Sequence, residues 1–507
     1  MTNRAFQGLA LGVSLAGTLI LVALILMRTH GVLIYTLDDP YIHLALAEEI
    51  LRGGYGINPG EVASPSSSIL YAPLLAPLLA LGFGTWAPLT ASAMGQAAVI
   101  WGLAGCVAPF VARRLWLAVP AALLLPLSVN AYALPLTGME HPLHAAASVL
   151  VILGLWRAAQ GRAPGWLVPA LLLAAAFRFE GYALALAAIL VLLALRHTRT
   201  ALVAVLGLGA LTLAYGLAMQ HLGLPFLPSS VMVKSQVSAA AAEADLGNTI
   251  SSLLVNLIRA VSNRWGLIFA CFTLIFAALA LSRRATRPVR AVAFAAFSTL
   301  AAHLLVGRYG WFGRYEVYAV ATLLAATLLI LPRQSRSAPA LVLALLAGLG
   351  WGYLPVTRQT PAAAQSVFEQ HYQMHRFATE FFPYPVAVND LGWVAYDNNI
   401  RVLDLWGLGS EIARQVTRHG GRTADTLRAL TEGVRYAMIY DIAFADAIPP
   451  EWCRIAQLTT SRVIAASDEV AVYLIDRSQE DSLRTALAAF EPGLPPGARL
   501  TLSECEP

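Results

Sequence analysis

The sequence predicts a polytopic α-helical membrane protein that ends in a soluble α/β domain. Its 507 residues are 58% hydrophobic and only 12% charged, a composition typical of membrane proteins rather than soluble ones. Long apolar runs recur up to about residue 355, separated by charged or Gly/Pro-rich breaks. From about Thr357 onward, short helix-like and strand-like stretches alternate instead.

The apolar runs predict about eleven transmembrane helices. We expect them at residues 6–27, 88–112, 115–135, 139–156, 165–179, 181–195, 200–219, 265–281, 289–306, 315–331 and 338–355. Arginines cluster in alternate loops, from Arg4 and Arg113-Arg114 to Arg333 and Arg336. Because positive residues favour the cytoplasmic side, we expect a cytoplasmic N-terminus. A transmembrane domain of residues 1–355 would then be followed by an extracytoplasmic domain of residues 356–507.

Two stretches of the first outer loop are predicted to be juxtamembrane helices. Ser66–Phe83 is apolar enough for a span, but counting it would move Arg113 and Arg114 to the outer side. Tyr41–Leu51 is more polar and suits a helix that lies in the membrane interface.

The C-terminal 150 residues or so suffice for one small domain with its own core. We expect helices at 365–381, 422–432 and 479–490, and strands at 386–388, 401–405, 436–440 and 470–475. Cys453 and Cys505 both fall in this domain. They could form a disulfide if the domain lies in an oxidising compartment.

Asp38 and Asp39 are adjacent carboxylates just beyond the first span. Charges next to hydrocarbon are costly and tend to mark functional sites. Because neighbouring residues point in different directions, one carboxylate could be a general base. The other could orient an acceptor, bind a cation, or simply cap the helix that starts at Pro40.

Further polar residues fall on the same outer side. Glu140 opens a span, where it is either an acidic residue favoured by the helix dipole or a second base or acceptor-binding carboxylate. His141 and His144 follow it and could form a metal site with Asp38 or Asp39. These residues identify no cofactor, and a divalent cation is left as an open alternative.

The outer basic residues are candidates for binding an anion. Lys234, the single lysine of the chain, either snorkels to lipid headgroups or contacts the phosphate of a lipid donor. Arg308 and Arg314 flank a short aromatic turn, and arginines on the outer side need a partner such as an anionic ligand. Arg178 and Glu180 could pair with each other. The remaining basic residues cluster at the ends of apolar runs, as membrane topology explains. We therefore do not expect nucleic-acid binding.

Several motifs occur in a fixed order along the chain. They are Asp38-Asp39-Pro40-Tyr41-Ile42, Asn58-Pro59-Gly60-Glu61, Gly138-Met139-Glu140, Arg178-Phe179-Glu180-Gly181, the stretch from Leu227 to Lys234, Arg314-Tyr315, Asp390-Leu391-Gly392 and Asp404-Leu405-Trp406-Gly407-Leu408. This set resembles the GT-C glycosyltransferase superfamily, most closely the bacterial arabinofuranosyltransferase-type enzymes that use decaprenyl-phosphate sugars.

The resemblance implies a GT-C-like fold in a bacterial inner membrane, with the C-terminal domain in the periplasm. It implies inverting transfer of a sugar, arabinofuranose being one candidate, from a polyprenyl-phosphate donor to a glycan, lipid or protein acceptor. Asp38 or Asp39 would be the base. We expect Glu140, Tyr41 and His141 to contact the acceptor or donor sugar, and Lys234, Arg314, Arg308 and Arg178 to contact the donor phosphate.

Two alternatives belong to other functional classes. One is a transporter or flippase of lipid-linked saccharide, which would place charged residues near the midplane of several spans; the predicted spans are nearly free of charge. The other is a non-catalytic glycan-assembly protein. Full transfer activity in an Asp38→Asn or Asp39→Asn variant would favour these alternatives.

Overall fold

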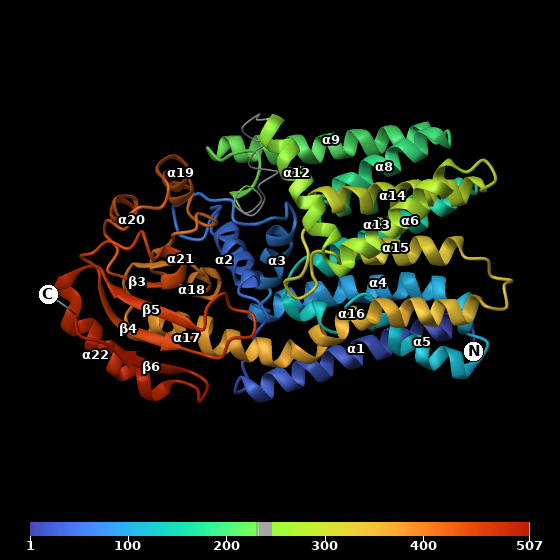
Figure 1. The fold of residues 1–507 in the computed structure, drawn as a ribbon. Coiled ribbons are helices and arrows are strands. Elements are labelled where there is room, and N and C mark those ends of the chain that lie inside the picture. The colour runs from blue at the N-terminus through green and yellow to red at the C-terminus, as the bar shows by residue number, and fades with distance from the viewer. Residues whose placement is uncertain (230–231, 233–245, 506–507) are drawn as a thin grey trace.

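The structure is a computed structural model that describes residues 1–229, 232 and 246–505. A helical bundle is joined to a smaller domain that contains a β-sheet, and the N-terminus lies at the end of the bundle opposite this domain (Figure 1). The bundle helices are α1 (Asn3–Arg28), α4 (Ala87–Val111), α5 (Leu115–Ser128), α6 (His141–Ala159), α7 (Leu167–Phe177), α8 (Gly181–Ala194), α9 (Thr198–His221), α12 (Leu246–Val261), α13 (Arg264–Leu281), α14 (Arg287–Val306), α15 (Val317–Ile330) and α16 (Ala338–Val367).

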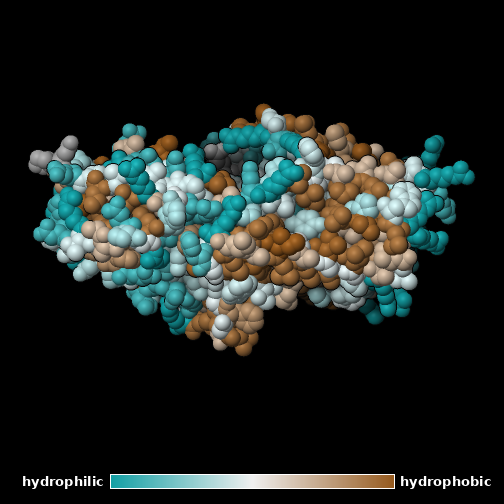
Figure 2. Space-filling view, turned by 90° about the horizontal axis from the view of Figure 1, so that it is seen from below, coloured by the Kyte–Doolittle hydropathy of each residue, from teal (hydrophilic) through white to brown (hydrophobic). Residues whose placement is uncertain are grey.

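Each of the eleven predicted spans coincides with one of these helices. In the described part of the chain, seven helices are long and apolar enough to cross a membrane: α1, α4, α6, α9, α13, α14 and α16. Hydrophobic residues cover the bundle between two more hydrophilic ends in the face shown in Figure 2. α5, α7, α8 and α15 are apolar but shorter. A helix of α8's 14 residues spans ~21 Å, less than the ~30 Å hydrocarbon core, so the count of eleven stays a prediction.

The loop between α1 and α4, which we call the first outer loop after its predicted location, contains two helices, but one is placed differently from the prediction. α3 (Tyr71–Ala80) occupies only the middle of the predicted 66–83 stretch. α2 (Asp39–Leu51) is buried from Pro40 to Ala47. It contacts both α3 and a helix of the C-terminal domain (Figure 1). The prediction of an interfacial helix at Tyr41–Leu51 is therefore wrong, because protein covers the faces that a membrane surface would occupy.

The bundle and the C-terminal domain are joined by one continuous helix. After α16 the chain stays helical through a π-helical turn (Phe368–Tyr372), α17 (Gln373–Arg376) and a second π-helical turn (Phe377–Phe381). The 44-residue helix from Ala338 to Phe381 is ~66 Å long. The helix expected at 365–381 is thus the far end of the last apolar helix.

The C-terminal domain is built on one mixed sheet with strand order β2-β1-β3-β5-β4-β6. β2, β1 and β3 are parallel, and β5, β4 and β6 pair antiparallel. The elements are β1 (Val386–Val388), α18 (Gly392–Ala395), β2 (Val402–Asp404), α19 (Glu411–Gly420), α20 (Ala424–Leu430), β3 (Tyr436–Ile439), α21 (Asp441–Phe444), β4 (Cys453–Thr459), β5 (Glu469–Leu474), α22 (Glu480–Phe490) and β6 (Arg499–Leu502). All four predicted strands are present, whereas β4 and β6 had not been predicted.

One hydrophobic core includes both the first outer loop and one face of this sheet. Tyr41 of α2 and Tyr71 of α3 belong to the same buried cluster as Val388 of β1 and Tyr436 of β3. The opposite face of the sheet has a separate core with Leu427 of α20 and other residues. Because burial of apolar area is the main stabilising term, the shared core holds the C-terminal domain against the first outer loop.

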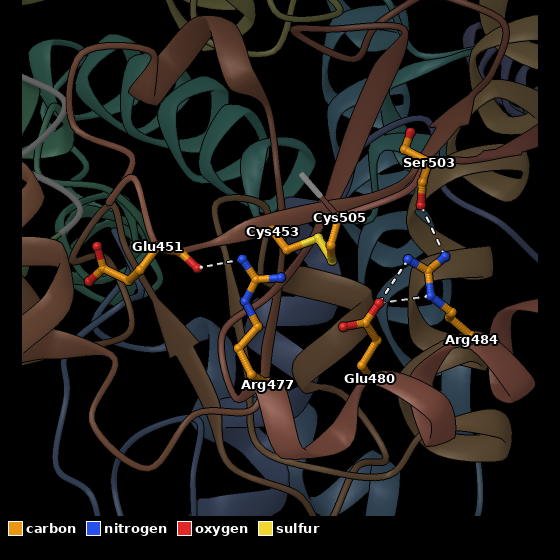
Figure 3. The surroundings of a disulfide bond; sticks show 7 residues. All are labelled: Glu451, Cys453, Arg477, Glu480, Arg484, Ser503 and Cys505. Atoms are coloured by element: carbon orange, nitrogen blue, oxygen red, sulfur yellow. Dashed lines mark hydrogen bonds and ion pairs between the residues drawn. A yellow bond between two sulfur atoms is a disulfide. The ribbon is translucent and has the colours of Figure 1, made fainter. Parts of the chain in front are cut away.

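A disulfide links the start of β4 to the tail that follows β6. Cys453 and Cys505 are bonded, with their Cα atoms 5.3 Å apart (Figure 3). Nearby, Arg484 of α22 donates to the Ser503 carbonyl over 3.0 Å and to Glu480 over 2.9 Å. Covalent and polar links therefore hold the chain end to the sheet.

We predict that the Cys453→Ser/Cys505→Ser double variant melts at a lower temperature than the wild type. The bond closes a loop with a sequence separation of 52 residues, for which chain entropy gives ~4 kcal/mol. Thermal melting of the purified protein measures the change. Cys271→Ser, which removes the exposed free cysteine, is the matched control. Four thiols titrating in the unreduced, denatured wild type would contradict the disulfide.

Candidate functional site

A cavity of about 460 Å³ lies where the first outer loop, the segment before α15 and the C-terminal domain meet. Its charged and polar lining includes carboxylates and guanidinium groups from segments far apart in sequence. The lining residues are Leu37, Asp38, Asp39, Ile42, Arg308, Trp311, Arg314, Tyr315, Val367, His371, Asn389, Asp390, Leu391, Trp406, Leu408, Ile464, Ala465 and Ala466. The structure therefore brings Asp38, Asp39, Arg308 and Arg314 together, as the sequence predicted.

Asp38 binds the C-terminal domain with both carboxylate oxygens. Its Oδ2 accepts from the Gly392 backbone N–H over 2.7 Å, and its Oδ1 accepts from the Trp393 N–H over 2.9 Å. Burial raises the pKa of this carboxyl to about 6, while His371 and the two N–H groups oppose the rise and Asp390 adds to it. The side chain makes no cap hydrogen bond to α2. Of the roles left open for this pair, Asp38 therefore does not take that of a side-chain cap for α2, because its carboxylate accepts the first two backbone N–H groups of α18 instead.

Asp39 is paired with Arg314 at the cavity wall. Arg314 Nη2 lies 3.2 Å from Asp39 Oδ2, and the Asp39 side chain keeps 24% of its surface exposed. Arg314 is only 2% exposed, and in the described part of the chain its Nε and Nη1 have no hydrogen-bond partner. Because a buried donor without a partner costs free energy, this guanidinium is arranged to donate to a further acceptor.

Three arginines surround the ring of Tyr315. The guanidinium carbons of Arg314, Arg308 and Arg178 lie 4.9, 5.3 and 5.7 Å from the ring centroid. The negative face of an aromatic ring attracts such cations. Tyr315 thus helps to hold these guanidinium groups near one another.

Glu140 and Arg178 form a buried layer behind the cavity. Arg178 Nη1 lies 2.9 Å from Glu140 Oε1, and its Nη2 lies 2.7 Å from Glu180 Oε1. The predicted Arg178–Glu180 pair is confirmed, but neither Glu140 nor Arg178 lines the cavity. Gly138, with φ +64°, opens the turn before Glu140, where an added Cβ would lie 2.7 Å from Pro40 Cβ. Removing one member of such a buried pair costs roughly 3–5 kcal/mol.

Tyr41 and His141 are also buried and do not line the cavity. The Tyr41 ring stacks on Trp393, with centroids 3.9 Å apart, so this side chain packs the shared core instead of reaching a ligand. The His141 ring meets Tyr315 edge-on at 5.8 Å. Among the described residues, no group of three or more His, Cys, Asp or Glu side chains could hold a metal ion, so the histidine–aspartate metal site gains no support. Lys234 lies outside the described residues.

The C-terminal domain contributes polar groups that had not been predicted as site residues. His371 Nε2 lies 3.1 Å from Asp390 Oδ2, and the Tyr440 hydroxyl donates to the same carboxylate. Burial lowers the pKa of His371, but Asp38 and Asp390 outweigh it, so the pKa is raised. Asp390 could have been identified from its place in the Asp390-Leu391-Gly392 motif. His371 lay in a predicted helix with nothing to mark it.

Two tryptophans add aromatic surface to the cavity. Trp311 is 45% exposed and has a left-handed backbone with φ +46°, a conformation that costs free energy and tends to occur at functional sites. Trp406 follows β2 in a turn held by Asp404, whose Oδ1 accepts from the Trp406 N–H over 2.8 Å and whose Oδ2 accepts from the Gly409 N–H over 2.8 Å. Such rings can stack on a flat apolar ligand face.

Comparison with known families gives one partial match. Residues 363–473 match the family described as a domain of unknown function, DUF8728. This stretch includes every C-terminal residue that lines the cavity, from Val367 and His371 to Ala466. No curated protein matches the chain.

We predict that Asp38→Asn lowers the melting temperature of the purified protein. The amide keeps one acceptor oxygen and turns an NH₂ group toward the other backbone N–H, so one charge-assisted hydrogen bond of ~1.5–3 kcal/mol is lost. Asp397→Asn is the matched control, because Asp397 is an exposed carboxylate just beyond α18. A variant Asp38→Asn that melts like the wild type would show that these two bonds do not hold the domain.

Proposed function

We propose that the protein is a glycosyltransferase that moves a sugar from a polyprenyl-phosphate donor to an acceptor, in a cavity at the outer membrane face. The observation that carries this proposal is the pairing of a partly exposed Asp39 with a buried Arg314, two of whose donor nitrogens have no partner among the described residues. A carboxylate and cations around one cavity are the groups that such a transfer needs. The seven membrane-length helices agree with a lipid-linked substrate.

Asp39 is the better candidate for the general base. Both oxygens of Asp38 already accept backbone N–H bonds, so that carboxylate serves to join the two domains. Asp39 would take the proton from an acceptor hydroxyl as the hydroxyl oxygen attacks the anomeric carbon. The bond from this carbon to the phosphate oxygen breaks, and the polyprenyl phosphate leaves with the electron pair, which inverts the anomeric configuration.

Arg314 and Arg308 would stabilise the departing phosphate. A guanidinium fork matches phosphate oxygens in two-point hydrogen bonds, and Arg314 is held in place by Asp39 and by Tyr315, whose hydroxyl lies 3.1 Å from its Nη2. Glu140 and Arg178 would help to position Tyr315 without contacting the phosphate. The Arg178 guanidinium lies over the Tyr315 ring, and Glu140 pairs with Arg178. The proposal includes arabinofuranose as one candidate sugar, and a glycan, lipid or protein as the acceptor.

The C-terminal domain would hold the acceptor. Its residues form part of the cavity wall, with Trp406 and the His371–Asp390 pair among them. A periplasmic location for this domain is supported by its disulfide, because such bonds persist in oxidising compartments. It is also supported by its distance from the arginine-rich end of the bundle (Figure 1).

We predict that purified protein releases free polyprenyl phosphate when it is offered a panel of polyprenyl-phosphate sugars with an acceptor glycan. Asp39→Asn should lower the rate by about 10²–10⁴-fold, because the base is lost. Arg314→Gln should lower it by about 10²–10³-fold, because the leaving phosphate loses a donor.

Glu48→Gln is the control for this series, because it alters another first-loop carboxylate outside the cavity. It should keep the wild-type rate. Melting temperatures of all variants separate lost chemistry from lost folding. Full release of polyprenyl phosphate by Asp39→Asn would overturn the role of Asp39, and no release from any donor would overturn the transferase proposal.

A further inference from the structure

A second cavity lies at the other end of the bundle, far from the site described above. It has a volume of about 680 Å³ and is formed by the end of α8, the end of α13 and the beginning of α14. The N-terminus lies at the same end of the molecule (Figure 1). The lining residues are Leu190, Val191, Ala194, Leu195, Arg196, Ala280, Arg287, Arg290, Ala291 and Phe294.

Three of the residues that line this cavity are arginines: Arg196, Arg287 and Arg290. No Asp or Glu occurs anywhere in residues 181–242 or 246–315. In the part of the chain that the structure describes, Arg196, Arg287 and Arg290 form no ion pair with any acidic residue. Arg290 Nε donates to the Ala280 carbonyl over 3.2 Å, which holds its stem across the end of α13. Like charges around one cavity repel each other, so an anion bound among them would be stabilised.

The remainder of the lining is apolar. It includes Leu190 and Val191 of α8 and Ala291 and Phe294 of α14. Arg196, with a left-handed backbone at φ +65°, turns the chain just after α8. The cavity thus combines cationic and apolar groups, and α8 also carries the exposed Leu193 beside it.

We propose that this cavity binds one anionic glycerophospholipid, with its phosphate between Arg196, Arg287 and Arg290 and an acyl chain along α8 and α14. Guanidinium groups bind phosphate oxygens in two-point hydrogen bonds. Basic pockets between transmembrane helices on the cytoplasmic side bind lipid headgroups in this manner. A free phosphate would satisfy the arginines but would leave the apolar wall unfilled. The site is independent of the proposed transferase activity.

The test titrates purified full-length protein in detergent with phosphatidylglycerol, phosphatidylcholine or inorganic phosphate, and follows the melting temperature. Native mass spectrometry counts the retained phospholipids. Phosphatidylglycerol should raise the melting temperature with saturation, and one phospholipid should be retained. Phosphatidylcholine and inorganic phosphate should have much weaker effects.

Two variants and a matched control locate the binding. Arg196→Gln/Arg290→Gln should raise the half-saturating phosphatidylglycerol concentration about tenfold or more. Ala194→Trp, at an exposed lining position, should weaken binding by filling the cavity without removing charge. Arg113→Gln/Arg114→Gln removes two arginines outside the cavity and should leave binding unchanged.

Three outcomes would overturn the proposal. The first is an equal loss of binding in the Arg113/Arg114 control, which would indicate diffuse attraction to a basic surface. The second is equal stabilisation by phosphatidylcholine, and the third is equal stabilisation by inorganic phosphate, which would indicate an anion site with no lipid.

Discussion

The contact between Asp38 and the N–H groups of Gly392 and Trp393 is the constraint on which the candidate site depends. It joins the first outer loop to a domain more than 350 residues later in the chain, with hydrogen bonds of 2.7 and 2.9 Å. Around it, Tyr41 stacks on Trp393, and both belong to the core shared with the sheet. An added Cβ at Gly392 would lie 2.1 Å from the Asp38 carbonyl oxygen. The two domains therefore meet closely enough to form one cavity between them.

In this arrangement the two adjacent carboxylates make different contacts. Asp38 positions the C-terminal domain, while Asp39 faces the cavity beside Arg314. The basic groups are divided in a similar way: Arg178 is neutralised by Glu140 and Glu180, whereas Arg314 keeps two donor nitrogens unpartnered among the described residues. Partial neutralisation concentrates the remaining positive charge at one wall, where a low-dielectric environment strengthens its effect on an anionic ligand.

The sequence predicts local features well and distant contacts poorly. Each apolar run that was expected to be a span is a helix, since periodic hydrophobicity is a local property. The lengths of those helices were predicted less accurately: α7 has only 11 residues, where a span at 165–179 had been predicted. Asp38, Asp39, Arg308 and Arg314 were found because charges near apolar runs stand out. The structural roles of Asp38 and Tyr41 were not predicted. Their partners, Gly392 and Trp393, are distant in sequence and come close only through tertiary packing. β4 was missed because Arg454 and Gln457 interrupt its apolar pattern.

The most direct test is a structure of the protein in a lipid nanodisc with a non-cleavable polyprenyl-phosphonate sugar. The account predicts phosphonate oxygens within hydrogen-bond distance of Arg314 Nε or Nη1 and the anomeric carbon beside Asp39. The isoprenoid would extend from the cavity toward the apolar surface of the bundle. Analogue bound elsewhere, with Arg314 still paired only within the protein, would contradict the account.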